Sequence, residues 1–179
     1  AVAFARANRI DKVIFDSPKA RLGIVTTGKS YLDVLQALEY LGLDDAACRD
    51  LGIRVYKVGM TWPLEPQGIR AFARGLEDIL VVEEKHSFIE SQIKELFYNF
   101  DGQRPSIVGK YDEAGEWILP STGELTPARI AGVIANTGTG TLGSIDLTAG
   151  ARTLTVNDGN AAVDLAVNVP IVNGTLTKS

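Results

Sequence analysis

The feature that most constrains the fold is an alternation of strand-like and helix-like segments through residue 135. Short runs rich in β-branched residues are each followed by a segment with apolar residues at helical spacing. Strands are expected at 21–27, 53–58, 78–84 and 106–111, and helices at 29–42, 67–76, 87–100 and 125–135. Such alternation forms a mainly parallel sheet covered on both faces, with ligand-facing loops at the carboxyl ends of the strands. The pattern therefore predicts an α/β fold.

The composition of the chain changes near residue 135. Every Phe, Tyr and Trp lies at or before Trp117, whereas the sequence from Asn136 onward is rich in Thr, Gly, Asn, Val and Leu. We therefore expect an α/β domain over residues 1–134 and a β-rich tail over residues 135–179. The chain begins with Ala1 rather than Met, and we expect that it was cut from a longer polypeptide.

Charge and cysteine content exclude several classes of function. A net charge of -4 provides no basic surface for a phosphate backbone, so nucleic acid is not an expected partner. A single cysteine, Cys48, and a single histidine, His86, are too few for a disulfide framework or for a zinc or iron–sulfur site. Cys48 is expected to be structural. With a single cysteine, a reducing cytoplasm is the expected location. No apolar run approaches the roughly 20 residues that span a bilayer, so we expect no membrane association.

Residues 23–30 read GIVTTGKS and match the phosphate-loop pattern G-x-x-x-x-G-K-[ST]. In a true phosphate loop the buried strand ends before the first glycine, because the following N–H groups must curl toward the phosphates. Here residues 24–27 favour extended structure, so Gly23 is expected inside the strand. Glu83 also stands where nucleotidases usually place an Asp. We expect a strand-to-helix turn, with a nucleotide-binding phosphate loop as the minor alternative.

Two groups of residues are candidates for binding. Free N–H groups and the helix dipole attract anions to the start of a helix. The turn from the 21–27 strand into the 29–42 helix therefore carries four anion-binding candidates: Thr27, Gly28, Lys29 and Ser30. A charged run at the end of the 78–84 strand would face a ligand or a neighbouring domain: Glu83, Glu84, Lys85 and His86. Charged strand ends are more often solvated or interfacial than catalytic, and no residue is assigned a catalytic or metal-binding role.

Trp62 is a further candidate, in the Pro-rich loop GMTWPLEP. A tryptophan in such a loop could stack on a ligand. More often it anchors packing against another domain, since its side chain buries a large area and keeps a polar N–H. We therefore favour an interface role for Trp62.

Three segments resemble a known family: RLGIVTTGKSYLDVLQALEYLGLD, GIRVYKVGMTWPLEPQGIRAFARGLEDILVVEEKHSFIESQIKELFYN and GEWILPSTGELTPARIA. They are similar to the middle region of bacterial indolepyruvate ferredoxin oxidoreductases, which belong to the thiamine-diphosphate-dependent 2-oxoacid ferredoxin oxidoreductases. The resemblance covers residues 1–134. It implies a domain like the C-terminal domain of transketolase, which is a three-layer α/β/α sandwich around a five-stranded, mostly parallel sheet with one antiparallel strand.

The same resemblance implies an enzymatic setting for the chain. In such enzymes a 2-oxoacid is decarboxylated on thiamine diphosphate, and electrons leave through iron–sulfur centres to ferredoxin as an acyl-CoA forms. The thiamine diphosphate, the magnesium and the clusters would lie elsewhere in the parent polypeptide. The chain is then expected to be a structural or assembly domain that is inactive alone, with other domains or subunits of the oxidoreductase as its partners.

The tail resembles a different class of protein. Its sequence GTGTLGSIDLTAGARTLTVNDGNAAVDLAVNVPIVNGTLTKS is similar to the β-helix repeats of autotransporter passenger domains. The alternative to the enzyme-domain hypothesis is therefore a fragment of a secreted β-helical adhesin. Because the two resemblances have no common physiological logic, we expect an artificial or misassembled junction near residue 135.

Overall fold

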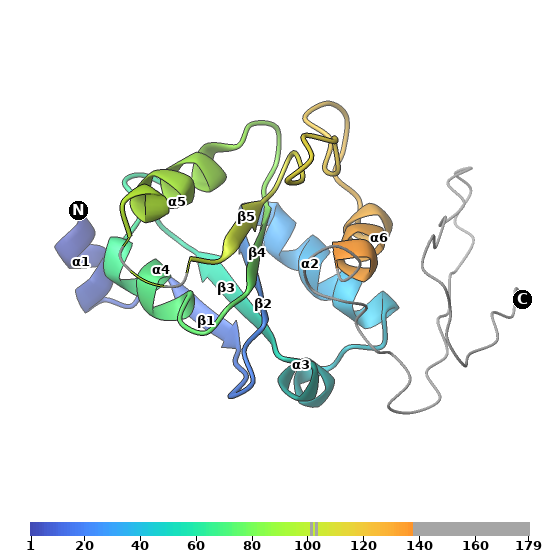
Figure 1. Ribbon diagram of the computed structural model, residues 1–179, viewed down its shortest axis with the longest axis horizontal. Helices are drawn as coiled ribbons and strands as arrows, with labels where there is room; N and C mark the ends of the chain where they lie inside the picture. Colours follow the sequence, from blue (N-terminus) through green and yellow to red (C-terminus); the bar gives the residue numbers. More distant parts are fainter. Residues whose placement is uncertain (101, 103, 138–179) are drawn as a thin grey trace, which may run out of the picture.

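The fold is a three-layer α/β/α sandwich, seen in a computed structural model that describes residues 1–100, 102 and 104–137. Figure 1 shows the sheet between two layers of helices, with α4 and α5 on one side and α2, α3 and α6 on the other. The helices are α1 (Val2–Ala7), α2 (Gly28–Tyr40), α3 (Asp45–Leu51), α4 (Pro66–Phe72), α5 (Phe88–Tyr98) and α6 (Pro127–Thr137). The strands are β1 (Lys12–Phe15), β2 (Leu22–Thr27), β3 (Ile53–Val58), β4 (Asp78–Val82) and β5 (Ser106–Val108).

The five strands lie in the order β1-β3-β2-β4-β5. β1 pairs antiparallel with β3, and the other pairs are parallel. Ile24 of the central strand β2 lies opposite Val55 on one side and Leu80 on the other. The topology confirms the predicted mostly parallel sheet with one antiparallel strand. Two strands end earlier than expected: β4 ends before Glu83 rather than at residue 84, and β5 ends before Gly109 rather than at residue 111.

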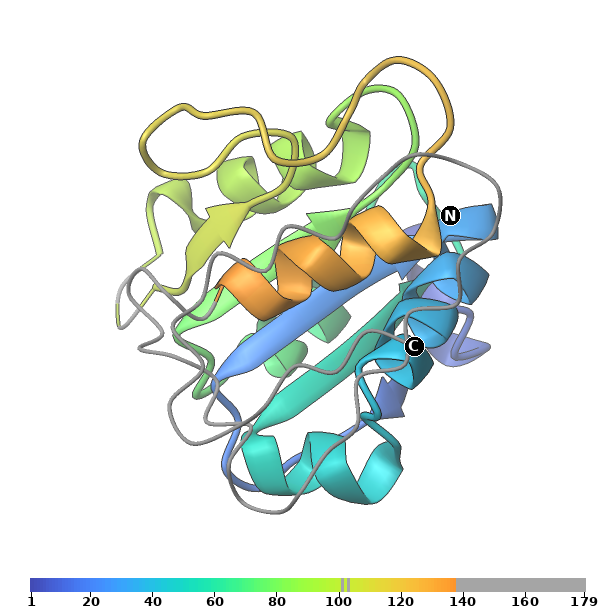
Figure 2. The same ribbon diagram turned by 90° about the vertical axis from the view of Figure 1, so that its right-hand side faces the viewer.

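Strands β2 and β4 are buried on both faces of the sheet. Successive side chains of a strand point to opposite faces, so Ile24 packs in the core under α2, α3 and α6, whereas Val25 packs in the core under α4 and α5. Figure 2 shows α2 and α6 side by side over the first of these faces. Burial on both faces explains why these strands read as nearly continuous apolar runs.

Three elements were not expected from the sequence: α1, α3 and β1. Helix α3 begins where the Asp44 side chain accepts a hydrogen bond from the Ala47 N–H at 2.8 Å, and it ends at Gly52, whose φ is 82°. Helix α1 is held against α4 by Arg6, whose Nη2 lies 2.7 Å from Glu65 Oε1. Glu65 also accepts hydrogen bonds from the first N–H groups of α4. A side chain that caps one helix and pairs with another fixes both in place.

The β-rich tail expected over 135–179 lies, from residue 138 on, outside the described residues, and the domain boundary stays a prediction. The two cores are built from residues up to Ala135 in the part of the chain that the structure describes. We therefore expect deletion of residues 138–179 to leave the midpoint of thermal unfolding nearly unchanged. Circular dichroism of the full and shortened chains measures this. Loss of the cooperative transition in the shortened chain would move the boundary beyond 137.

Candidate functional site at the carboxyl edge of the sheet

The candidate site is the edge of the sheet where the four parallel strands end. Strands β2, β3, β4 and β5 run in the same direction, so the residues that follow them meet at one edge. Ligands of open α/β sheets bind at this edge. The site candidates proposed from the sequence lie at, or shortly after, one of these strand ends.

The junction between β2 and α2 does not form a phosphate loop. Gly23 pairs with Arg54 and Ile79 inside β2, as the sequence predicted. The strand continues to Thr27, and α2 begins at the next residue, Gly28, with a φ of 53°. No curled segment stands between strand and helix, so the phosphate-loop alternative is wrong. Gly28 permits the tight bend because a positive φ is costly for other residues.

The four anion-binding candidates lie together at the start of α2. Thr27 Oγ1 donates a hydrogen bond to a carbonyl oxygen of β3 at 2.9 Å, and Ser30 is buried. Lys29 Nζ lies 2.8 Å from Asp33 Oδ2 and 3.3 Å from Glu124 Oε1. The hydrogen bond with Asp33 raises the pKa of Lys29, burial opposes this shift, and the hydrogen bond with Glu124 adds to it. The carboxylates of Asp33 and Glu124 therefore offset the positive charge of Lys29, which an anion would need for binding. Anion binding at this turn stays a prediction.

We expect the chain to bind no ATP at this junction, and Lys29→Ala to leave thermal unfolding nearly unchanged. The Lys29 side chain is about half exposed and its ion pairs are accessible to water, where such pairs contribute little. Isothermal titration with ATP and with inorganic phosphate, on both chains, checks this. A phosphate affinity that disappears in Lys29→Ala would instead establish the anion site.

Glu83 is buried and serves as the anion for the amino end of α5. Its carboxylate accepts hydrogen bonds from the N–H groups of Ile89 at 2.8 Å and Glu90 at 3.0 Å. Burial raises the pKa of Glu83, while these N–H groups and the nearby ammonium of Lys110 act to lower it. A carboxylate at this position complements the helix dipole. The carboxylate oxygens are therefore engaged within the domain.

The rest of the charged run faces outward to different degrees. Glu84 is half-buried, whereas Lys85 and His86 are exposed. Lys85 has a φ of 56°, and its Nζ donates a hydrogen bond to the carbonyl oxygen of Gly123 at 2.9 Å. A non-glycine residue at such a φ is uncommon. The run therefore turns sharply after β4 and contacts the segment that precedes α6.

Lys110 is a buried residue of this edge that the sequence did not indicate. Its Nζ donates hydrogen bonds to the carbonyl oxygens of Glu83 at 2.5 Å and Pro120 at 3.2 Å. Its backbone N–H donates to Glu90 Oε2 at 3.1 Å. Burial lowers the pKa of Lys110, and the carboxylates of Glu83, Glu84 and Glu90 oppose this shift. Because 106–111 reads as an ordinary strand with its lysine near the end, only the folded structure identifies this ammonium as buried.

The connection between β5 and α6, residues 109–126, is fixed to the edge by lysines and by apolar anchors. Two lysines that follow other strands contact it, Lys29 at Glu124 and Lys85 at Gly123. Within the connection, Lys110 contacts Pro120. Leu119 and Leu125 are fully buried in the core under α2 and α6. The connection is therefore an ordered part of the domain.

Trp62 lies exposed beside a groove. Its side chain is 65% exposed, and its ring centroid is 5.6 Å from that of Phe88, itself 48% exposed. The groove has a volume of about 680 Å³, and its lining includes Trp62, Pro63, Leu64, Leu96 and Phe100 together with the charged Arg70 and Glu95. An exposed aromatic pair next to an apolar recess is the kind of surface that proteins use in interfaces.

Within residues 1–100, 102 and 104–137, no group of three or more His, Cys, Asp or Glu side chains could hold a metal ion. Cys48 is buried within α3. Among the helices of this range, none has the length and apolar character needed to cross a membrane.

Asp78 is a buried carboxylate at the opposite edge, where β4 begins. It is 5% exposed, and burial, followed by the carboxylates of Glu113 and Glu77, raises its pKa to about 6. The folded state therefore binds a proton more tightly than the unfolded state, in which an Asp titrates near pH 4. The contribution of Asp78 to the free energy of unfolding consequently decreases as the pH rises from about 4 to about 6.

We expect Asp78→Asn to raise the free energy of unfolding at pH 7 by roughly 1 to 3 kcal/mol, because the amide removes the unfavourable buried charge. The gain should shrink below pH 6 and vanish well below about pH 4, where Asp78 is protonated in both states. Urea unfolding of both chains across this pH range measures the difference. A gain that is independent of pH would contradict the assignment to Asp78.

The fold and this edge together define an α/β domain of the sandwich class with a charged, partly aromatic carboxyl edge. Residues 12–162 match the family described as the indolepyruvate oxidoreductase domain. The chain belongs to the indolepyruvate oxidoreductase domain family. This confirms the resemblance stated from the sequence. The match extends past residue 134, and it leaves the resemblance of residues 135–179 to autotransporter repeats without support.

Curated relatives agree with the family assignment. The indolepyruvate oxidoreductase subunit IorA of Thermococcus kodakarensis is 33% identical over 116 residues, which cover 65% of this chain and 16% of that protein. IorA of Pyrococcus abyssi is 33% identical over 117 residues, again 65% of this chain and 16% of that protein. The matched segment is thus a small part of the curated relatives.

Solved structures also resemble the chain at low identity. An inactive β4 tetramer of a split-gene transketolase has a TM-score of 0.47 and 19% identity, covering 72% of this chain and 41% of that one. A 2-oxoglutarate:ferredoxin oxidoreductase from Magnetococcus marinus, with 2-oxoglutarate, coenzyme A and succinyl-CoA bound, has a TM-score of 0.45 and 18% identity. It is matched over 69% of this chain and 19% of its own length.

Proposed function

We propose that this chain is an assembly domain of a thiamine-diphosphate-dependent indolepyruvate ferredoxin oxidoreductase and is inactive alone. The observation that carries the proposal is the family match over residues 12–162, supported by IorA relatives at 33% identity. The matched segment is 16% of those relatives. A domain of this size, in which Lys29, Glu83 and Lys110 are engaged in internal contacts, suits positioning of other modules better than chemistry of its own.

The residues present do not fit the cofactors of such an enzyme. Iron–sulfur clusters need several cysteine thiolates, and the sequence has one cysteine, which is buried. Magnesium that holds a diphosphate needs carboxylate or carbonyl ligands in one place, and the described residues hold no such group of side chains. We therefore assign thiamine diphosphate, magnesium and clusters to other parts of the parent enzyme, and no reaction step to this chain.

The partners we propose are other domains or subunits of the oxidoreductase, with ferredoxin as the electron acceptor of the whole enzyme in the cytoplasm. Among the interface candidates proposed from the sequence, Trp62 fits an interface best, since its ring is exposed beside the groove. In the charged run after β4, Glu84 is half-buried and His86 is exposed, so both can take part in an interface. Glu83 would act indirectly, by fixing the start of α5.

The test compares two purified proteins in one assay. Indolepyruvate, coenzyme A, thiamine diphosphate, magnesium and oxidised ferredoxin are supplied, and ferredoxin reduction is followed by its visible absorbance. We expect the 179-residue chain to reduce no ferredoxin. The second protein is a complete enzyme, with its partner subunits, whose IorA-type subunit contains residues 1–137 at the matching position, and we expect it to reduce ferredoxin. Turnover by the isolated chain would refute the inactive-alone proposal, and failure of the complete enzyme with indolepyruvate and other 2-oxoacids would refute the parentage.

A further inference from the structure

The connection from β5 to α6 carries a feature that the fold does not require. Connections in α/β domains usually need about 2 to 6 residues, and connections above roughly 12 residues are commonly functional. This one occupies residues 109–126 between Val108 and Pro127. Its first half forms a small hairpin, residues 110–118, that we call the acidic hairpin.

The acidic hairpin is ordered by its own hydrogen bonds. Tyr111 and Trp117 form an antiparallel bridge, and the Ile118 N–H donates to the Lys110 carbonyl oxygen at 3.0 Å. At the turn, the Asp112 N–H donates to the Glu116 carbonyl oxygen at 2.9 Å, and Asp112 Oδ1 accepts from the Glu116 N–H at 2.8 Å. The backbone of this hairpin is therefore held in one conformation.

Its two aromatic side chains remain largely outside the core. Tyr111 is 53% exposed and Trp117 is 52% exposed, whereas Leu119, two residues further on, is fully buried. Large aromatic side chains on a rigid backbone lose little conformational entropy on binding, and Trp and Tyr are enriched among the residues that dominate binding energies. Exposure of both aromatics on one ordered hairpin is thus the signature of a docking surface.

The charge of the acidic hairpin specifies the partner. Asp112, Glu113 and Glu116 lie in its turn, and its only cation, Lys110, points inward and is buried. Glu113 and Glu116 are exposed, so the exposed charge of the hairpin is negative. A complementary surface has Lys or Arg side chains around an apolar recess that receives the tryptophan.

We propose that the acidic hairpin docks into a basic, apolar recess on another part of the oxidoreductase. This inference rests on the proposed function, which places residues 1–137 among other modules of a larger enzyme. The family supports such a partner, because the matched segment makes up 16% of the curated relatives. Trp117 supplies the apolar contact, and Glu116 contributes to the attraction and to its dependence on salt.

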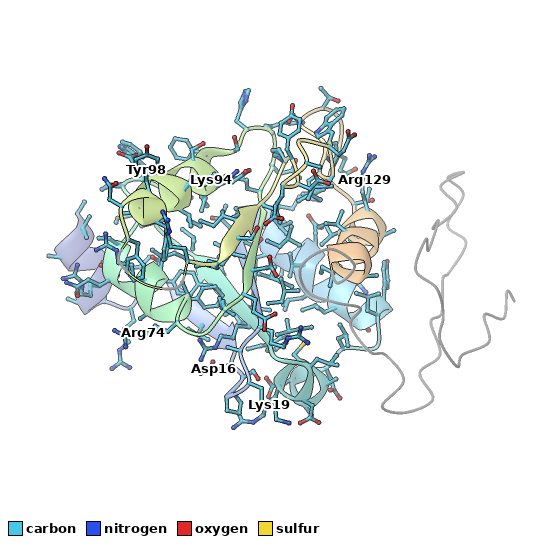
Figure 3. The ribbon with its side chains drawn as sticks, viewed as in Figure 1. Asp16, Lys19, Arg74, Lys94, Tyr98 and Arg129 are labelled. Atoms are coloured by element: carbon cyan, nitrogen blue, oxygen red, sulfur yellow. The ribbon has the colours of Figure 1, made fainter. Side chains whose placement is uncertain are left out.

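The test uses the complete oxidoreductase with the photoreactive residue p-benzoylphenylalanine at position 117. The matched control carries it at position 98, because Tyr98 is 75% exposed and lies at the end of α5, across the molecule from Arg129 of α6 (Figure 3). After irradiation, crosslinked peptides are identified by mass spectrometry. We expect position 117, and not position 98, to crosslink to a Lys- or Arg-containing peptide outside residues 1–137.

Charge variants make the test specific. Glu116→Gln should lower the crosslink yield from position 117 several-fold, as should added salt, whereas Glu95→Gln on α5 should not. Crosslinks only to a second copy of residues 1–137, or equal yields from positions 117 and 98, would overturn the inference. Ferredoxin reduction is measured in the same preparations. An active enzyme without the crosslink refutes the docking surface alone, and a crosslink in an enzyme without 2-oxoacid activity refutes the proposed function alone.

Discussion

Replacing Lys110 by methionine is expected to lower the free energy of unfolding by about 2 to 4 kcal/mol. Lys110 is 2% exposed, and its ammonium donates hydrogen bonds to the carbonyl oxygens of Glu83 and Pro120. Methionine fills a similar volume, so the change isolates the loss of the donor and of the charge. Two carbonyl oxygens then lose a buried partner, and the buried Glu83 carboxylate loses its nearby cation.

The control for this prediction is Lys94→Met. Lys94 pairs with the same cluster, since its Nζ lies 2.6 Å from Glu90 Oε1, but its side chain is 50% exposed. An exposed pair contributes less than about 1 kcal/mol. Urea unfolding of both variants measures the difference. Equal losses from the two substitutions would show that burial of Lys110 has no energetic consequence.

A double substitution separates the charge from the hydrogen bonds. Glu83→Gln keeps an oxygen that accepts from the N–H groups of α5 but removes the buried negative charge. The uncompensated charge of Glu83 is one expected source of the loss in Lys110→Met. If it accounts for much of that loss, the loss of unfolding free energy in the double variant should be smaller than the sum of the two single losses by about 1 kcal/mol. Strict additivity would assign the loss to the carbonyl oxygens instead.

The parts of the fold that were predictable are those fixed by local periodicity. The segments 53–58 and 87–100 carry apolar residues at strand and helix spacing, and the structure has β3 and α5 there. Strand β1 could not be predicted in this way. Its four residues KVIF are exposed or half-buried, and they become a strand through antiparallel pairing with β3. That pairing is a tertiary contact, which no short window of sequence reveals.

For the candidate site, the sequence predicted the location but not the side-chain contacts. Strand ends locate the carboxyl edge, so Lys29, Glu83 and Trp62 could be proposed from sequence alone. What each side chain contacts depends on residues far away in the chain, such as Glu124 for Lys29. The sequence therefore predicted where charged groups gather, but not that Glu83 would be engaged by α5 or that Lys110 would be buried beside it.

A substitution at Gly23 tests whether this residue lies inside β2, the assignment that excluded the phosphate loop. We expect Gly23→Val to lower the free energy of unfolding by about 3 kcal/mol. A Cβ atom at this position would lie 2.4 Å from Leu76 Cδ1 and 2.8 Å from Phe72 Cε1. Both side chains belong to the core under α4 and α5 and are nearly fully buried. They can approach the strand closely only because residue 23 has no side chain, and an added branched group must displace them.

A double-mutant cycle with Leu76→Ala provides the control for this prediction. Leu76→Ala alone should destabilise by about 2 to 5 kcal/mol through the cavity it creates. In the double variant the added methyl groups occupy part of that cavity, so the combined loss should be smaller than the sum by more than about 1 kcal/mol. Chemical denaturation of the four chains gives the coupling energy. A coupling energy of zero, with little loss in Gly23→Val, would place residue 23 outside the packed strand, and the ends of β2 and the start of α2 would have to be assigned anew.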